Sequence, residues 1–431
     1  MNDDLMLDIL RSRVFTALGC TDPVVVSYAA ALAASVAEGN PEAVTVTVDK
    51  STYKNALRVT IPKTDLRGLD YACALGLIGG KAEHRLECLK EITSEQIDEA
   101  IRMVKRSIIK VRVKEETGLY SEVALKTGGG SVTGRIEKTY TNITALEVDG
   151  ENRLHKFNGP QARQALPGLE GLTLAAIYDF VESCRLEKLL FLEQGCVMNL
   201  QAARQGLKAD GSVFFGQGIM KALGESEPFS SPVAAAKVLT AAASDMRMGG
   251  YDVPITATAG SGNQGITCLV PIAAVAEREG AGREELVRAA ALGHLVAIYI
   301  KDRLNDASQA CGCSIAAGAG AAAGVAYLLG GGQKEAYDAV INTVGGLAGV
   351  ICDGAKRGCA YKLSISAGIA VESALLALKG VVIPAGDGIV SGDPEKTVAN
   401  LSLVIGEGMA GVDDCVIKVL HELSGAEKLK K

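Results

Sequence analysis

Alternation of apolar and polar residues is confined to residues 42–155, and this limits the folds that the chain can adopt. Segments such as AVTVTVDK, SIIKVRV and SEVALKT have the period of two that is typical of half-buried β-strands. Gly128-Gly129-Gly130 indicates a hairpin turn between two strands. Thr93 and Gln96 form a capping box that opens a helix within the same region. We therefore predict a small α+β domain with an antiparallel sheet over residues 41–156.

The rest of the chain has helical periodicity. We predict an all-helical domain over residues 157–431, with no strand, and an N-terminal segment, residues 1–40, whose helices pack on that domain. Ser231-Pro232 and Asp393-Pro394 are typical helix starts. The predicted helices lie near 3–18, 23–38, 65–79, 94–105, 171–183, 185–204, 232–246, 264–278, 283–303, 314–329, 334–350, 362–378, 395–408 and 412–424.

The composition argues against several classes of protein. The 431 residues carry a formal net charge of −6 and contain no basic block, so we expect no nucleic-acid partner. The uncharged runs at 253–276 and 307–333 lack the Leu, Ile and Phe density of a lipid-facing helix, so we expect no membrane span. The acidic, amphipathic N-terminus does not resemble a secretory signal. We therefore expect a cytoplasmic protein whose eleven cysteines are reduced thiols or metal ligands.

The spacing of three cysteines is typical of an iron–sulfur site. Cys352 and Cys359 lie seven residues apart in ICDGAKRGC, and Cys311 opens CGCSIAAGAGAAAG, 41 residues upstream. Three thiolates can hold three irons of a four-iron cluster and leave the fourth iron open as a Lewis acid. The alternative is that they are small buried core residues, since free cysteine is often fully buried.

Cys20 lies just before a predicted helix start in LGCTDPVVV. The helix dipole and the free N–H groups at such a position favour an anion, so we predict a lowered thiol pKa. A thiolate can act as a nucleophile or as a base. Thr21 and Asp22 also explain the turn by themselves, in which case Cys20 only fills space.

A glycine-rich turn, Gly260-Ser261-Gly262-Asn263-Gln264-Gly265, precedes an apolar helix. Such a turn can bind an anion, for example a substrate carboxylate, or it can be a plain polar turn. It lacks the Gly-Lys-Ser/Thr ending of a phosphate-binding loop. His294 lies in the middle of a predicted helix, and we expect it to be a core histidine. Lys356, between two of the candidate ligands, can neutralise a cluster, hold a carboxylate or lie in a solvated loop.

The motifs LGCTDP, YKNALRVTIP, GSGNQGI, CGCSIAAG, ICDGAKRGCAYKLS and GDGIV together resemble the L-cysteine desulfidase family, over residues 15–410. That family is related to the alpha chain of iron–sulfur L-serine dehydratase. The resemblance implies a [4Fe-4S] cluster held by Cys311, Cys352 and Cys359. It also implies a proton-abstracting cysteine at Cys20. Cys313 is an alternative ligand because CGC offers two thiols.

The resemblance further implies α,β-elimination of a small amino acid, L-cysteine, without pyridoxal phosphate. Tyr140 stands in YTNI, where the family leads us to expect HTNI. Two alternatives remain: a lyase for L-serine or another β-substituted amino acid, and a non-catalytic, cluster-containing sensor. We expect a homo-oligomer. The candidate substrate-binding residues are Thr21, Asp22, Lys54, Asn55, Ser261, Asn263, Gln264 and Lys356.

Overall fold

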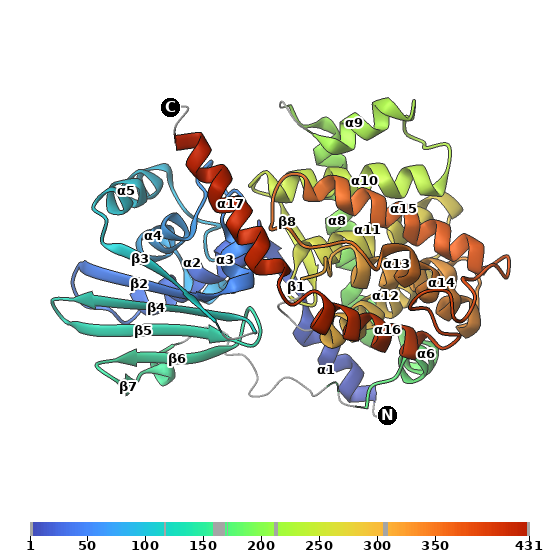
Figure 1. Ribbon diagram of the computed structural model, residues 1–431, viewed down its shortest axis with the longest axis horizontal. Helices are drawn as coiled ribbons and strands as arrows, with labels where there is room; N and C mark the ends of the chain where they lie inside the picture. Colours follow the sequence, from blue (N-terminus) through green and yellow to red (C-terminus); the bar gives the residue numbers. More distant parts are fainter. Residues whose placement is uncertain are drawn as a thin grey trace.

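The computed structural model describes residues 3–115, 118–157, 169, 171–210, 214–304 and 309–428. Figure 1 shows two lobes side by side. The sheet lobe, residues 19–157, carries a six-stranded sheet; the helical lobe comprises residues 3–18 and 171–408. The last helix, α17 (Val412–Lys428), runs across the junction and contacts the sheet lobe. The observed fold is α+β, as predicted.

The sheet is mixed rather than antiparallel. Its strand order is β3-β2-β4-β5-β6-β7, and β2 pairs with β3 in parallel while the other pairs are antiparallel. The prediction of an antiparallel sheet was therefore wrong for one pair. Three α-helices and the 3-10 helix η1 separate β2 from β3, and a long crossover of this kind allows parallel pairing. The strands are β2 (Pro41–Asp49), β3 (Ile109–Lys114), β4 (Tyr120–Thr127), β5 (Gly130–Glu137), β6 (Ile143–Val148) and β7 (Glu151–Asn152).

Helix α2 (Thr21–Ala34) packs on one face of this sheet and on α4, and nearly all of its residues are buried. The close approach depends on Gly134 of β5, because a Cβ there would lie 2.6 Å from the carbonyl oxygen of Ala29. Helix α1 (Asp3–Arg13) packs instead on the helical lobe. The other helices of the sheet lobe are α3 (Lys50–Ala56), α4 (Leu69–Gly79), η1 (Ala82–Glu87), α5 (Ser94–Lys105) and η2 (Leu154–Lys156).

We predicted that the chain outside residues 41–156 contains only helices. This was wrong, because two strands lie there. β1 (Val14–Leu18) pairs antiparallel with β8 (Pro254–Thr258), so the N-terminal helix ends at Arg13 rather than at 18. Short apolar runs such as VFTAL fit a strand or a helix equally well by periodicity. Whether such a run forms a strand depends on a strand to pair with, which here lies some 240 residues away. Strand β8 leads directly into the glycine-rich turn and so fixes its position.

The helical lobe is built around helices rich in Ala and Gly. Helix α13 (Ile315–Leu328) is almost wholly buried, and a Cβ at Gly320 would lie 2.3 Å from the carbonyl oxygen of Gly293 on α12. The remaining elements of the lobe are α6 (Leu174–Ser183), α7 (Leu186–Leu189), η3 (Leu190–Leu192), α8 (Glu193–Lys208), α9 (Phe215–Ala222), α10 (Pro232–Met248), α11 (Gly262–Glu279), α12 (Arg283–Arg303), α14 (Gln333–Leu347), α15 (Cys359–Ala377), α16 (Pro394–Leu403) and η4 (Val404–Gly408).

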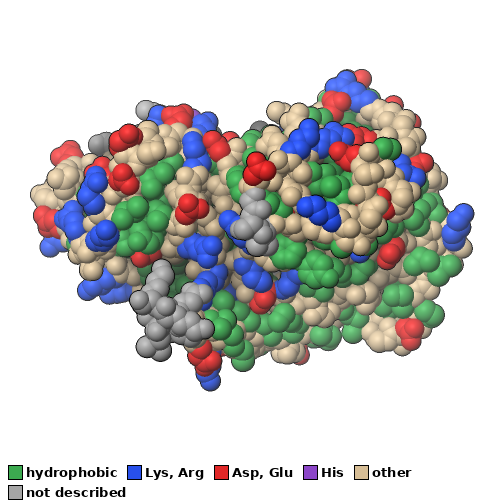
Figure 2. All heavy atoms as spheres, turned by 90° about the horizontal axis from the view of Figure 1, so that it is seen from above, with side chains coloured by type: hydrophobic (Ala, Val, Ile, Leu, Met, Phe, Trp, Pro, Cys, Tyr) green, Lys and Arg blue, Asp and Glu red, His purple; other side chains and the backbone are tan. Residues whose placement is uncertain are grey.

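Among the described helices, α15 is long and apolar enough to cross a membrane by length and composition. More than half of its apolar stretch is buried within the protein, where it packs on α10, α13 and α14. The face drawn in Figure 2 carries Lys, Arg, Asp and Glu side chains interspersed over both lobes, with apolar patches between them.

Candidate active site

A cavity of about 100 Å³ lies where the two lobes meet, and it gathers residues that are far apart in sequence. The sheet lobe contributes the start of α2, helix α3 and Tyr140. The helical lobe contributes the start of α11 and the loops that precede α13 and α15. Nine of the predicted site residues line it: Cys20, Asp22, Asn55, Ser261, Asn263, Gln264, Cys311, Cys352 and Cys359.

Cys20 is the N-cap of α2, and its side chain is buried beside Asp22. Its Sγ lies 3.6 Å from Oδ2 of Asp22. The hydroxyl of Tyr140 donates to the other carboxylate oxygen, Oδ1, at 3.0 Å. Asp22 also has a side-chain hydrogen bond with Asn55. Tyr140 and Asn55 therefore hold the carboxylate in place beside Cys20.

The prediction of a lowered Cys20 pKa was wrong for the protein as described. Burial raises the pKa of the Cys20 thiol to about 12, and the negative charge of Asp22 raises it further, whereas Arg247 lowers it. Burial also raises the pKa of the Asp22 carboxyl, against the hydrogen bond from Tyr140. Desolvation at this site thus outweighs the effect of the helix N-terminus.

Four further thiols line the same cavity. The loops before α13 and α15 are joined by backbone hydrogen bonds, in which Cys311 N donates to Val350 O at 2.8 Å and Cys352 N donates to Gln309 O at 2.8 Å. Cys359 is the first residue of α15 and follows the loop that carries Cys352. Cys313 is the fourth thiol, and its Sγ lies 3.5 Å from Oγ of Ser261.

Cys311 and Cys313 hydrogen-bond to one another, which distinguishes the two thiols of CGC. That bond lowers the pKa of Cys311 to about 6 and raises the pKa of Cys313. Lys362 adds a positive charge that lowers the pKa of Cys311.

The donor set fits an iron–sulfur cluster better than a single metal ion. Within the described ranges, no group of three or more His, Cys, Asp or Glu side chains converges closely enough to hold one ion. Each thiolate of a four-iron cluster binds a different iron, so its ligands stand apart around a central space. Cys311, Cys352 and Cys359 line one cavity from two joined loops, and they supply the thiol donors that such a cluster needs.

The glycine-rich turn connects β8 to α11 and presents the start of that helix to the cavity. Ser261 is the N-cap but its side chain makes no capping bond, and Asn263 and Gln264 are buried in the first turn. A Cβ at Gly265 would lie 1.8 Å from Thr256 O, so only glycine fits between the helix and β8. Oε1 of Gln264 is buried without a hydrogen-bond partner among the described residues. The N–H groups at the start of α11 can bind an anion, whereas Oε1 of Gln264 can accept a hydrogen bond from a ligand.

Three predicted substrate-binding residues lie outside the cavity lining. Thr21 is buried in the first turn of α2. Nζ of Lys54 is bonded to Asp413 of α17 and to the carbonyl oxygen of Cys352. Lys356 is bonded to Asp353 and to the carbonyl oxygen of Gly354. Lys54 and Lys356 therefore support the cysteine loop rather than face the cavity.

Arg247, Ser51 and Lys301 line the cavity but were not predicted from the sequence. Arg247 ends α10 in SDMRMGG, where a basic residue in the last helical turn is ordinary and gives no signal of a site. Lys301 ends α12 in a similar way.

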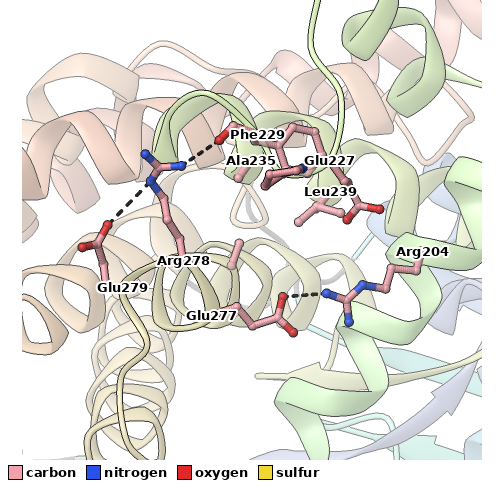
Figure 3. A pocket seen from close by; sticks show the side chains of 10 residues that line it. Arg204, Glu227, Phe229, Ala235, Leu239, Glu277, Arg278 and Glu279 are labelled. Carbon is pink, nitrogen blue, oxygen red and sulfur yellow. Dashed lines mark hydrogen bonds and ion pairs between the residues drawn. The ribbon is translucent and has the colours of Figure 1, made fainter.

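A larger pocket, of about 750 Å³, lies elsewhere, among side chains of α8, α10 and α11. Figure 3 shows two ion pairs in it, Arg204 with Glu277 and Arg278 with Glu279, and a hydrogen bond from Arg278 to the carbonyl oxygen of Phe229. None of the predicted site residues lines it.

The sequence matches a family model and several known proteins. The family model of the serine dehydratase alpha chain matches residues 83–418. A UPF0597 protein of Clostridium tetani is 36% identical over 422 residues, which cover 97% of this chain and 98% of that protein. A UPF0597 protein of Caldanaerobacter subterraneus subsp. tengcongensis is 37% identical over 430 residues, covering 97% and 99%. One of Desulfatibacillum aliphaticivorans is 38% identical over 427 residues, covering 96% and 97%.

The matched region contains four of the five cavity thiols, all but Cys20, and the start of α11. The serine dehydratase alpha chain family is iron–sulfur dependent, in keeping with the donor set of the cavity. These matches extend over most of the chain, and the protein belongs to the serine dehydratase alpha chain family.

Proposed function

We propose that the protein is an iron–sulfur lyase that converts L-cysteine to pyruvate, ammonia and sulfide. The observation that carries the proposal is the shared cavity, in which a buried thiol–carboxylate pair faces four further thiols and a helix N-terminus. An elimination needs a base, a site for the substrate carboxylate and a means of activating the leaving group. The cavity contains a candidate for each.

Cys311, Cys352 and Cys359 would hold the cluster. When bound, a cluster with three protein ligands supplies an open iron that acts as a Lewis acid toward the β-substituent of the substrate. Two lysines support the loop that carries Cys352. Lys54 Nζ donates to Cys352 O at 3.0 Å, and Lys362 Nζ donates to Ile351 O at 3.0 Å. The loop is thereby fixed before substrate arrives.

Cys20 is the proposed base for the α-proton of the substrate. With a pKa of about 12 it is a thiol at neutral pH, hydrogen-bonded towards Asp22. The ammonium group of a bound amino acid favours the thiolate, because a positive charge nearby stabilises the charged form of a thiol. Asp22, held by Tyr140, is placed to take the thiol proton and to bind that ammonium group. Elimination then gives aminoacrylate, which hydrolyses to pyruvate and ammonia.

L-serine is the second candidate substrate, and the family match favours it. Elimination from serine uses the same residues and differs only in the leaving group, a hydroxyl instead of a thiolate. The preference for cysteine rests on the resemblance of the sequence motifs. Substrate identity is therefore the point that an experiment must decide.

The test is a substrate panel with anaerobically reconstituted protein. L-cysteine, L-serine and D-cysteine are supplied in separate assays, and pyruvate, ammonia and sulfide are measured. We expect the highest kcat/KM with L-cysteine and no reaction with D-cysteine, whose α-proton points away from the base. A higher kcat/KM with L-serine would favour the dehydratase. No product from any of them, in protein that holds a cluster, would favour a sensor.

A further inference from the structure

We propose that Arg247 anchors the carboxylate of the amino-acid substrate; this inference rests on the proposed function. Arg247 is 2% exposed, yet it lines the cavity together with Cys20 and Asn263. Its Nε and Nη2 are buried and have no hydrogen-bond partner within the described part of the chain. A buried guanidinium with unused donors is unfavourable unless a ligand supplies the acceptors.

The two unused atoms identify the kind of ligand. Nε and Nη2 form one edge of the planar guanidinium, and their two N–H groups point in parallel. That edge matches the two oxygens of a carboxylate in a bidentate pair. The remaining nitrogen, Nη1, donates to Sδ of Met248 at 3.3 Å, and a thioether sulfur is a weak acceptor.

The surroundings of Arg247 point to the same anion. A Cβ at Gly262 would lie 2.3 Å from Nε, so the glycine at the first position of α11 lets the guanidinium lie against the helix N-terminus. The free N–H groups there also favour an anion. Asp22 interacts with Arg247 through its charge, but no hydrogen bond joins them, so the guanidinium edge is left for a ligand.

This assignment places the substrate. Its carboxylate lies beside both Arg247 and the start of α11, and its α-carbon lies near Cys20, which lines the same cavity. Compounds without a carboxylate should bind poorly. Lys54, which was predicted from the sequence to bind substrate, instead forms an ion pair with Asp413.

A pair of ligands tests the inference without turnover. 3-Mercaptopropionate and 3-mercaptopropionamide differ only in the carboxylate, and neither has the α-amino group that elimination to aminoacrylate requires. Binding is measured by calorimetry with reconstituted wild-type protein and the Arg247→Met, Arg247→Lys and Arg283→Met variants. Arg283 is the matched control, because it is exposed and paired with Glu193.

We expect the wild type and Arg283→Met to bind the carboxylate at least 10-fold more tightly than the amide. Arg247→Met should weaken carboxylate binding by about 10–100-fold and leave amide binding unchanged, since a charged hydrogen-bonded pair is lost. Arg247→Lys should keep part of the discrimination. Gly262→Ala, which displaces the guanidinium, should weaken carboxylate binding in the same direction and decides the matter if Arg247→Met does not fold.

Undiminished discrimination in folded Arg247→Met or in Gly262→Ala would overturn the inference while leaving the lyase proposal intact. Loss of iron from Arg247→Met with discrimination retained would also overturn it, because the guanidinium would then serve the thiolates. Conversely, discrimination that depends on Arg247 in a protein that eliminates neither cysteine nor serine would support the carboxylate site and reject the proposed reaction.

Discussion

Nζ of Lys54 lies 2.5 Å from Oδ1 of Asp413 in an ion pair that is almost fully buried. The pair joins α3, which carries Asn55 into the cavity, to the start of α17 at the other end of the chain. The same ammonium group donates to the carbonyl oxygen of Cys352. One side chain therefore connects α3, which lines the cavity, to the cysteine loop and to α17.

Lys54→Met should destabilise the protein by about 3 kcal/mol, because it leaves the carboxylate of Asp413 buried without its partner. The double variant Lys54→Met with Asp413→Asn should recover much of this loss, since the unpaired charge is then removed. Urea unfolding of the wild type and the variants measures the free energies. Equal free energies of unfolding for the wild type and Lys54→Met would show that the Lys54–Asp413 ion pair does not stabilise the protein.

Cys20→Ala should keep its iron and lose elimination activity by roughly 10²–10⁴-fold, the usual contribution of a positioned base. Iron content and sulfide production are measured on the same preparation. Cys73→Ala serves as the control, because Cys73 is a fully buried thiol of α4 that does not line the cavity. Loss of iron from Cys20→Ala would make Cys20 a cluster ligand instead, and full activity would place the base elsewhere.

Cys311→Ser should lose most of the cluster, whereas Cys313→Ser should retain it. Cys311 has the lowered pKa of the pair and is bonded through its backbone to the loop that carries Cys352. Cys313 contacts Ser261 of the glycine-rich turn, so its loss should affect the substrate side of the cavity. Iron and acid-labile sulfide analysis of both variants distinguishes them, and the reverse pattern would move the ligand to Cys313.

His294 should make the protein less stable as the pH falls below about 6.5. It is fully buried in α12, hydrogen-bonded through Nδ1 to the hydroxyl of Thr258, and burial lowers its pKa to about 3. An unfolded histidine has a pKa of about 6.5, so between these values the unfolded state binds a proton that the folded state excludes. The resulting loss between pH 7 and 5 is about 2 kcal/mol.

Urea unfolding of the wild type and His294→Gln across this pH range checks the prediction. The variant lacks the titrating group, so its stability should fall less steeply with decreasing pH. Parallel curves for the two proteins would show that His294 does not carry the effect.

Local signals in the sequence predicted local structure well. The capping box of Thr93 and Gln96 is present at the start of α5, with both of its hydrogen bonds. The Gly128–Gly130 turn joins β4 to β5 as predicted. His294 is a core histidine. Each of these outcomes is decided by neighbouring residues, whose chemistry can be interpreted from the sequence alone.

Features that depend on distant partners were missed. Strands β1 and β8 form only because they pair with each other, and β3 lies parallel to β2 because a helical crossover separates them. Arg247 carries no local mark of its role, since only the fold brings it against Gly262. Cys20 shows the limit of a local electrostatic argument, because burial outweighs the helix N-terminus beside it.

The central claim, that elimination depends on a cluster held by the cavity thiols, is tested most directly by one titration. Protein freed of iron is reconstituted anaerobically in steps, and iron, acid-labile sulfide and the rate of pyruvate formation from L-cysteine are measured on each sample. We predict that the rate rises in proportion to cluster content and levels off at about four irons and four sulfides per chain, the content of one four-iron cluster. Full activity in iron-free protein, or stoichiometric zinc with no acid-labile sulfide after reconstitution, would contradict the claim.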